Sequence, residues 1–147
     1  MAAAVTSSGP SRIQCVGGIV HDEAGRLLLV RRGTEPARGT WSVPGGRVEA
    51  GESDPEATAR EVLEETGLPV VVGRLLGTVE REAPSGGVYV INDYLCTAAP
   101  GADVAAVRGG DDAADARWFS PEDVAALHTA PGLVAALVEW GVLPDVD

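Results

Sequence analysis

The chain has 147 residues, of which 45% are apolar, and a formal net charge of −11 from 11 basic and 22 acidic residues. This length and composition fit one globular domain, which we expect at residues 12–147 after a flexible segment of small and polar residues at 1–11. The excess of acid argues against a protein that grips nucleic acid, because such binding relies on a basic surface.

The N-terminal residues lack the apolar core of a signal peptide, and no run reaches the roughly 18 apolar residues of a membrane span. We therefore expect a cytoplasmic protein without a membrane partner. The two cysteines, Cys15 and Cys96, lie in apolar runs without the spacing of a zinc site or a disulfide framework. They are predicted to be buried free thiols.

The chain begins with two apolar runs that predict strands. Ile13–His21 and Arg26–Arg32 are separated by a turn and are expected to form a hairpin. The second strand ends in Arg31 and Arg32, and adjacent strand residues point to opposite faces, so at most one of them can face a site. Trp41 follows after a loop, in the sequence WSVPGG, and is expected in the core or the wall of a substrate pocket rather than as a platform for base stacking.

A helix is predicted over Asp54–Thr66. Ser53 can cap its first turn, with Glu56 three residues later as in a capping box, and Gly67 can end it in the left-handed conformation. At about 100° per residue, one face of this helix is expected to pack against the core. That face consists of Ala59, Val62, Leu63 and Thr66.

Roughly the opposite face of the helix carries Glu61, Glu64 and Glu65. Their spacing of i, i+3 and i+4 brings three carboxylates together, which is unfavourable unless a cation lies between them. Mg²⁺ prefers oxygen ligands and recruits phosphate oxygens of a substrate, so the cluster predicts a divalent-metal site for phosphate chemistry. A solvated acidic face is the alternative for a helix rich in glutamate.

Two further strands are predicted after the helix. Val70–Val79 is an apolar run whose glycines suggest a bend, and Val88–Thr97 follows the turn-forming sequence APSGG. The second run carries Asn92 and Asp93 in mid-strand. One of these two residues is a candidate for lining a pocket, although an edge strand explains them equally well.

The last third of the chain is predicted as a loop, a short strand and two helices. A loop rich in Ala, Gly and Asp, Ala98–Asp112, precedes the strand Ala116–Phe119. Ser120–Leu127 is expected to be a helix capped by its first residue, and Thr129 can cap a second helix that Gly141 ends. Strands with one central helix and two terminal helices indicate an α/β sandwich with a mixed sheet.

The stretch from Gly46 to Leu68 resembles the Nudix box, G-x5-E-x7-R-E-U-x-E-E-x-G-U, in which U is an aliphatic residue. Every specified position is present: Gly46, Glu52, Arg60, Glu61, Val62, Glu64, Glu65, Gly67 and Leu68. The flanking sequences WSVPGG and RWFSPED also resemble this family, so the resemblance extends to most of the chain. It implies a Nudix-like α/β/α sandwich with a mixed central sheet.

The resemblance also implies roles for the box residues. Glu61, Glu64 and Glu65 would be ligands of Mg²⁺, or of Mn²⁺, and a carbonyl of the glycine pair at Gly46 would be a further ligand. One of these carboxylates would also accept a proton from the attacking water. Some family members place a catalytic or metal-binding Glu before the last strand, and the candidates here are Asp111, Asp112 and Asp115, of which we select Asp115.

Other implied roles concern the loop and the substrate. An ion pair between Glu52 and Arg60 would tie the loop before the helix to the helix, so we assign both residues, with Gly67, a structural role. An arginine at the end of the second strand can contact substrate phosphate in this family, which makes Arg31 and Arg32 substrate-binding candidates.

The predicted reaction is Mg²⁺-dependent hydrolysis of a diphosphate bond in a nucleoside diphosphate linked to another moiety, by a Nudix-type pyrophosphohydrolase. A nucleoside triphosphate and an ADP-ribose-like compound are equal candidates. Pro84 resembles a feature of ADP-ribose-hydrolysing relatives, although a plain turn explains it as well. A diphosphate isomerase of the same fold and a non-catalytic nucleotide-sensing module are alternatives against which the intact box weighs. Many relatives are dimers, so a homodimer is a further open expectation.

Overall fold

The computed structural model describes residues 11–35, 37–84, 86–110 and 112–144. Its strands are β1 (Arg12–Val20), β2 (Leu27–Arg32), β3 (Trp41–Ser42), β4 (Gly45–Arg47), β5 (Val70–Glu82), β6 (Val88–Ala98) and β7 (Ala113–Phe119). Its helices are α1 (Asp54–Thr66), α2 (Pro121–Ala126) and α3 (Leu133–Glu139), with a 3-10 turn η1 at Val104–Ala106. Residues 1–10 of the segment expected to be flexible lie outside the described residues. Ser11 is held in place, because its carbonyl oxygen accepts a 2.7 Å hydrogen bond from the Val88 N–H.

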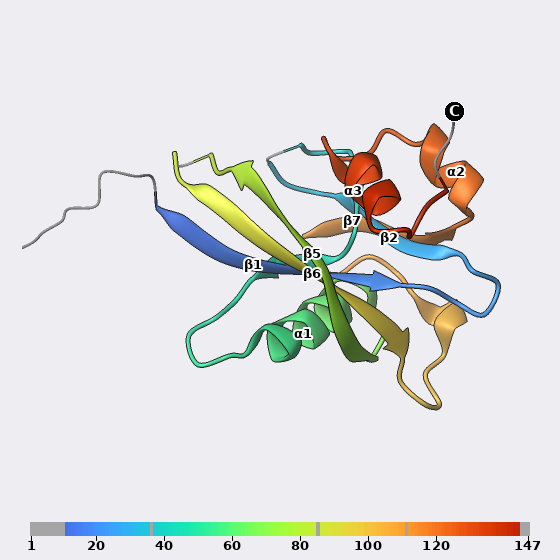
Figure 1. Cartoon of the computed structure of the whole chain (residues 1–147). Helices are drawn as coiled ribbons and strands as arrows, with labels where there is room; N and C mark the ends of the chain where they lie inside the picture. The colour runs from blue at the N-terminus through green and yellow to red at the C-terminus, as the bar shows by residue number, and fades with distance from the viewer. Residues whose placement is uncertain (1–10, 36, 85, 111, 145–147) are drawn as a thin grey trace, which may run out of the picture.

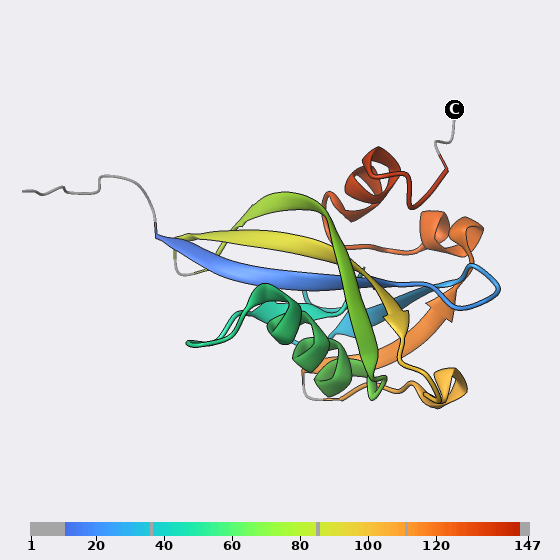
Figure 2. The same cartoon turned by 60° about the horizontal axis from the view of Figure 1, so that its bottom comes forward.

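Within the described residues the strands form two sheets. The first is a four-stranded mixed sheet of order β4-β1-β6-β5, in which β1 runs parallel to β6 and antiparallel to β4. The second is a three-stranded antiparallel sheet of order β3-β2-β7. Helix α1 lies on one side of the strands, and α2 and α3 lie on the other (Figure 1, Figure 2). The predicted α/β class with a mixed sheet is confirmed.

The expected hairpin of the first two strands is wrong. β1 and β2 belong to different sheets, although an isolated antiparallel bridge between His21 and Leu27 and a 3.0 Å backbone bond from Asp22 to Arg26 close the turn between them. β1 pairs instead with β6, from Arg12 opposite Val88 to Val20 opposite Cys96, and β2 pairs with β7. The turn between the two runs signals a reversal of the chain but does not specify the partner strand. Both runs are apolar on both faces, so each strand must be buried by other parts of the protein on both sides.

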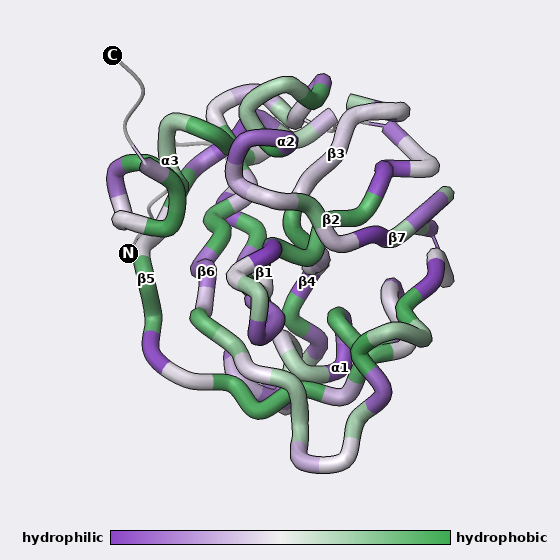
Figure 3. Tube along the Cα trace, turned by 90° about the vertical axis from the view of Figure 1, so that its right-hand side faces the viewer, coloured by the Kyte–Doolittle hydropathy of each residue, from purple (hydrophilic) through white to green (hydrophobic). Residues whose placement is uncertain are grey.

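The core has two parts, one on each side of the buried strands. Figure 3 shows apolar stretches of β1 and β2 passing between α1 and the pair α2 and α3. Because side chains alternate along a strand, β2 contributes Leu27 and Leu29 to one part and Leu28 to the other. The first part also contains Leu137 of α3, and the second contains Val62 of α1.

Helix α1 has the ends that the sequence predicts. The Ser53 hydroxyl accepts a 3.2 Å hydrogen bond from the Glu56 N–H, and the Glu56 carboxylate accepts a 2.9 Å bond from the Ser53 N–H. This is the reciprocal capping box. Gly67 ends the helix with φ at 78°, the left-handed region that favours glycine.

The buried face of α1 differs from the prediction. Val62 and Thr66 are fully buried as predicted, but Leu63 is 49% exposed and Thr58 is fully buried in addition. Both threonine hydroxyls donate to carbonyl oxygens one turn earlier in the helix, at 2.8 and 2.7 Å, so neither leaves a polar group unpaired. The pattern of apolar residues in the sequence could not show that a threonine would be buried while Leu63 is exposed. The helix also approaches β1 closely, because a Cβ at Gly18 would lie 2.7 Å from Val62 Cγ2.

The segment before α3 also differs from the prediction. Thr129 does not cap α3, which begins after Gly132 at φ 82°. Residues around Thr129 instead pair with β3, because the Trp41 N–H donates to the His128 carbonyl at 3.0 Å and the Ala130 N–H donates to the Trp41 carbonyl at 2.9 Å. Backbone pairing therefore outweighs the local capping preference of threonine here.

Smaller expectations have mixed outcomes. Cys15 and Cys96 are buried free thiols, as predicted. The register of β5 against β6 shifts twice between Val72 and Gly77, which is the expected bend. β7 begins at Ala113, three residues before the predicted start. In the described part of the chain, no helix is long and apolar enough to cross a membrane.

Candidate active site

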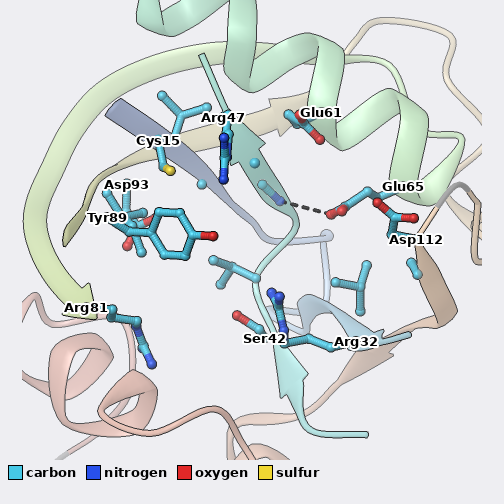
Figure 4. A pocket seen from close by; sticks show the side chains of 18 of the residues that line it. Cys15, Arg32, Ser42, Arg47, Glu61, Glu65, Arg81, Tyr89, Asp93 and Asp112 are labelled. Carbon is cyan, nitrogen blue, oxygen red and sulfur yellow. Dashed lines mark hydrogen bonds between the residues drawn. The ribbon is translucent and has the colours of Figure 1, made fainter. Parts of the chain in front are cut away.

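A pocket of about 600 Å³ lies on the face of the four-stranded sheet that is turned away from α1. Alternate residues of two neighbouring strands form the floor of the pocket, as expected from the alternation of side chains along a strand. They are Tyr89, Ile91 and Asp93 of β6 and Val79 and Arg81 of β5, and the residues between them do not line the pocket. β4 and the end of β2 close its sides. Figure 4 shows this pocket with charged groups entering from several elements.

Two of the predicted glutamates, Glu61 and Glu65, reach this pocket from α1 past the edge strand β4. The glycine pair of β4 makes this possible. The Gly45 N–H donates a 3.0 Å hydrogen bond to Oε1 of Glu65 (Figure 4). A Cβ at Gly46 would overlap the carboxylate of Glu61, so a glycine is needed where that side chain crosses the strand. The structure therefore brings Gly46, Glu61 and Glu65 together.

Burial raises the pKa of Glu65 from its ordinary value of 4.5 to about 7. The hydrogen bond from Gly45 and the charge of Arg32 oppose this rise, whereas the carboxylates of Glu61 and Asp112 add to it. Glu65 can therefore take up or release a proton near neutral pH.

Arg60 is the centre of a network of carboxylates beside the pocket, one of which, Glu61, also lines it. Its guanidinium donates to both oxygens of Glu52 at 2.6 and 2.9 Å, which is the expected ion pair between helix and loop. It also donates to the Arg47 carbonyl oxygen at 3.1 Å, and so fixes the end of β4. The same group contacts Glu61 Oε2 and Glu64 Oε1, each at 3.1 Å. Arg60 thus holds together the segments that carry the box.

Glu64 differs from its two neighbours in the predicted cluster. Its carboxylate is bound to Arg60 and does not line the pocket. Among the described residues, no group of three or more His, Cys, Asp and Glu side chains is arranged to hold a metal ion. Arg60 Nη1 contacts both Glu61 and Glu64 at 3.1 Å, so this guanidinium lies between two of the three carboxylates, while Glu61 and Glu65 line the pocket.

The two arginines at the end of β2 point to different sides. Arg32 lines the pocket, and Figure 4 shows its side chain directed toward the interior. Arg31 is exposed, lies opposite Trp41 in the sheet and does not line the pocket. This agrees with the alternation that allowed only one of the pair to face a site.

Asp115 and Trp41 do not line the pocket. Asp115 lies within β7, and its carboxylate forms a 2.8 Å ion pair with Arg117. Asp112, just before β7, is the acid from this segment that lines the pocket, while Asp111 lies outside the described residues. The Trp41 ring packs edge-on against Phe119 at 4.9 Å, in the first part of the core.

The sequence analysis did not identify most of the residues of β5 and β6 that line the pocket. Asp93 was one of two open candidates, and neither Tyr89 nor Arg81 was selected. The alternation of β6 was the available signal, since Tyr89 and Asp93 are four residues apart and share one face. It did not show which face would meet the pocket, because Asn92 on the other face is polar as well.

A family model described as the NUDIX domain matches residues 11–140 of the chain. The chain belongs to the NUDIX family. A "MutT-like protein" of Streptomyces ambofaciens is 35% identical to this Nudix protein over 118 residues, which cover 80% of the chain and 70% of that relative. The predicted family and the enzyme class of Nudix hydrolases are thereby confirmed.

Other relatives carry more specific names. An "ADP-ribose pyrophosphatase" of Methanocaldococcus jannaschii is 36% identical to the Nudix protein over 71% of the chain and 59% of the relative. A "putative 8-oxo-dGTP diphosphatase" of Bacillus subtilis is 34% identical over 70% of the chain and 63% of the relative. The chain therefore spans less than two thirds of the length of each of these two proteins.

Solved structures agree with the fold. The crystal structure of a MutT protein from Methanosarcina mazei Go1 superimposes on the Nudix protein with a TM-score of 0.77 and 29% identity, covering 92% of this chain and 96% of that one. The two chains therefore share the fold over nearly their whole lengths.

Proposed function

We propose that this Nudix protein hydrolyses a diphosphate bond of a small nucleotide in a reaction that requires Mg²⁺, for which Mn²⁺ can substitute. The observation that carries the proposal is the meeting of Glu61 and Glu65 with Arg32 in one pocket. Carboxylates suit a hard divalent cation, and a guanidinium binds phosphate through parallel hydrogen bonds. The pocket therefore combines the two groups that a diphosphate substrate needs in an acidic protein.

The residues present fit Mg²⁺. This ion is usually bound through one or two carboxylates, keeps several waters and adds phosphate oxygens of the substrate. Glu61 and Glu65 would supply the carboxylates and the Gly46 carbonyl a further oxygen, whereas Glu64 does not line the pocket and would have to turn toward it. When bound, the ion would neutralise phosphate charge and lower the pKa of the attacking water.

The protein's own groups orient the reactants. The Gly45 N–H fixes one oxygen of Glu65, and Arg60 restrains Glu61 through a 3.1 Å contact. Arg32 would bind a phosphate oxygen on the opposite wall of the pocket. A pocket carboxylate would accept the proton of the attacking water.

The substrate class follows from the family and its named relatives. We propose a nucleoside diphosphate derivative, either a nucleoside triphosphate or an ADP-ribose-like compound. Pro84 gives no support to the ADP-ribose-like compound, because this residue is exposed and does not line the pocket.

A substrate panel with product identification tests the proposal. Nucleoside triphosphates and ADP-ribose are incubated with Mg²⁺, and the released products are identified by chromatography. Glu65→Gln should lower kcat by at least about 100-fold. Glu139→Gln, the same change at an exposed position of α3, should have no effect. Turnover in excess EDTA, or a wild-type rate for Glu65→Gln, would overturn the proposal.

A further inference from the structure

The side of the pocket away from the glutamates carries a cationic group, Arg81 of β5. Strand alternation turns Arg81 toward the pocket, whereas its neighbours Glu80 and Glu82 do not line it. β5 lies three strands across the sheet from β4, which is about 14 Å at the ordinary spacing of strands. Figure 4 shows Arg81 and Glu65 at opposite sides of the pocket. The chemistry proposed for the glutamate end does not use Arg81.

The Arg81 guanidinium has no bonded partner in the described part of the chain. No hydrogen bond or ion pair joins it to another described residue, and the residue beside its Nη2 is Gly132, which has no side chain. Arg81 is only half-exposed. The other described arginines whose side chains form no such bond are all exposed to water: Arg31, Arg38, Arg74 and Arg108. Arg81 is therefore the member of this group that neither the protein nor full hydration satisfies.

A positive charge at this position is unfavourable in the free protein. Burial lowers the pKa of Arg81, the charge of Asp93 opposes this change, and the charge of Arg32 lowers the pKa further. Asp93 is 4% exposed and forms no ion pair with Arg81, and its own burial favours the uncharged carboxyl group. Two guanidinium groups that repel each other across one cavity are stabilised when an anion binds between them. The Arg81 side of the pocket therefore suits a negatively charged group of a ligand.

We infer that Arg81 binds a second phosphate group of the nucleotide, which the ribose carries as a phosphate ester on its 2′- or 3′-hydroxyl. A guanidinium binds a phosphate through two parallel hydrogen bonds. The phosphates of a triphosphate chain are joined directly to one another and would lie together at the glutamate end. A phosphate ester on the ribose is separated from the diphosphate by the sugar, so it can reach the opposite side of the pocket.

This inference rests on the proposed function, because it takes the diphosphate to lie beside Glu61 and Glu65. It also narrows the substrate class, since a nucleoside triphosphate and an ADP-ribose-like compound both have a ribose next to the diphosphate. The preferred substrate would be a derivative whose ribose carries the additional phosphate. Arg81 would determine which nucleotides bind and take no part in breaking the diphosphate bond.

Binding measurements on the full-length protein test the inference. The ligands are adenosine and guanosine 5′-monophosphate, and the same nucleotides with a second phosphate on the 2′- or the 3′-hydroxyl. None of them contains a diphosphate bond, so the Kd is measured by titration calorimetry with Mg²⁺ present and without hydrolysis. At least one bisphosphate should bind roughly 10-fold or more tightly than its monophosphate, because the added group accepts charge-assisted hydrogen bonds. The two isomers show which hydroxyl carries the phosphate.

The variants isolate the guanidinium. Arg81→Gln removes the charge, so the preference for the bisphosphate should fall to within about threefold. Arg81→Lys keeps the charge but cannot form the paired bonds, so its preference should lie between these two values. Arg74→Gln, the same change at an exposed position of β5 outside the pocket lining, should keep the wild-type preference. Circular dichroism checks that the variants are folded.

Two outcomes would overturn the inference. One is a wild-type protein that binds every bisphosphate no more tightly than its monophosphate, or that binds none of the nucleotides. The other is an Arg81→Gln variant that retains the full preference. Failure of the proposed function gives a different result, because a protein that hydrolyses no nucleotide can still show the preference and its loss in Arg81→Gln. Hydrolysis of a diphosphate bond without any preference for the bisphosphates would contradict this inference alone.

Discussion

Replacing Asp93 with asparagine should stabilise the protein, and by more at high pH than at low pH. Burial raises the pKa of Asp93 from its ordinary value of 3.8 to about 7, although Arg81 opposes the rise. In this interval the carboxyl group is ionised in the unfolded chain and protonated in the folded one. The unfolded state therefore binds fewer protons, and stability falls as the pH rises from about 4 to about 7. One pH unit corresponds to about 1.4 kcal/mol, so the full effect is about 4 kcal/mol.

Urea unfolding at about pH 5 and about pH 8, followed by the fluorescence of the tryptophans, measures this effect. EDTA is present so that bound metal does not contribute. The gain in free energy of unfolding of Asp93→Asn over the wild type should be larger at pH 8 than at pH 5 by about 2–3 kcal/mol. Glu65 titrates in the same range but is present in both proteins, so its contribution cancels. An equal difference at both pH values would refute the reasoning.

Three other substitutions test separate features. Gly46→Ala places a methyl group against the Glu61 carboxylate and should lower kcat by at least about 100-fold, measured in steady-state assays with Mg²⁺. Arg60→Gln removes the paired bonds to Glu52 and should lower the free energy of unfolding by about 1–3 kcal/mol in urea. Asp54→Ala removes the acceptor of two hydrogen bonds from β6 and should cost about 1–2 kcal/mol in the same assay.

Each of these three substitutions has a control measurement. Gly46→Ala should unfold within about 1 kcal/mol of the wild type, and wild-type turnover would show that Glu61 does not need the space at this glycine. Arg60→Lys should recover only part of the stability, because an ammonium group cannot make the paired bonds of a guanidinium. Asp54→Ala should leave the preference for nucleoside bisphosphates unchanged, since Asp54 lies across the sheet from the pocket.

The box could be predicted almost completely from the sequence because its signals are local. The capping box of Ser53 and the stop at Gly67 depend on residues within a few turns of one another, whereas the pair of Glu52 with Arg60 was implied by the resemblance to the Nudix box. The position of Glu64 could not be predicted, because the spacing of helix residues gives proximity but not the partner that each carboxylate selects. Arg60 contacts Glu61 and Glu64 alike, at 3.1 Å, and Glu61 also lines the pocket whereas Glu64 does not.

The remaining errors come from contacts between residues distant in sequence. The partner of β1 lies more than 70 residues away on β6, and no local pattern in either run identifies it. Asp112 lines the pocket in place of Asp115 because β7 starts earlier than its apolar residues suggest and carries Asp115 into the sheet. Leu63 is exposed because Thr58, which was not placed on the buried face of α1, packs there beside Val62 and the predicted Thr66. Tertiary pairing overrides local preference in each case.

The two faces of β6 make different contacts. Tyr89, Ile91 and Asp93 face the pocket, whereas Asn92 and Tyr94 donate hydrogen bonds at 2.9 and 3.2 Å to Asp54 at the start of α1. Substitutions on the pocket face can therefore change which ligand is accepted without loosening the helix that carries the glutamates. One strand thus allows the choice of substrate to diverge among descendants of this protein while the machinery that breaks the bond is inherited intact.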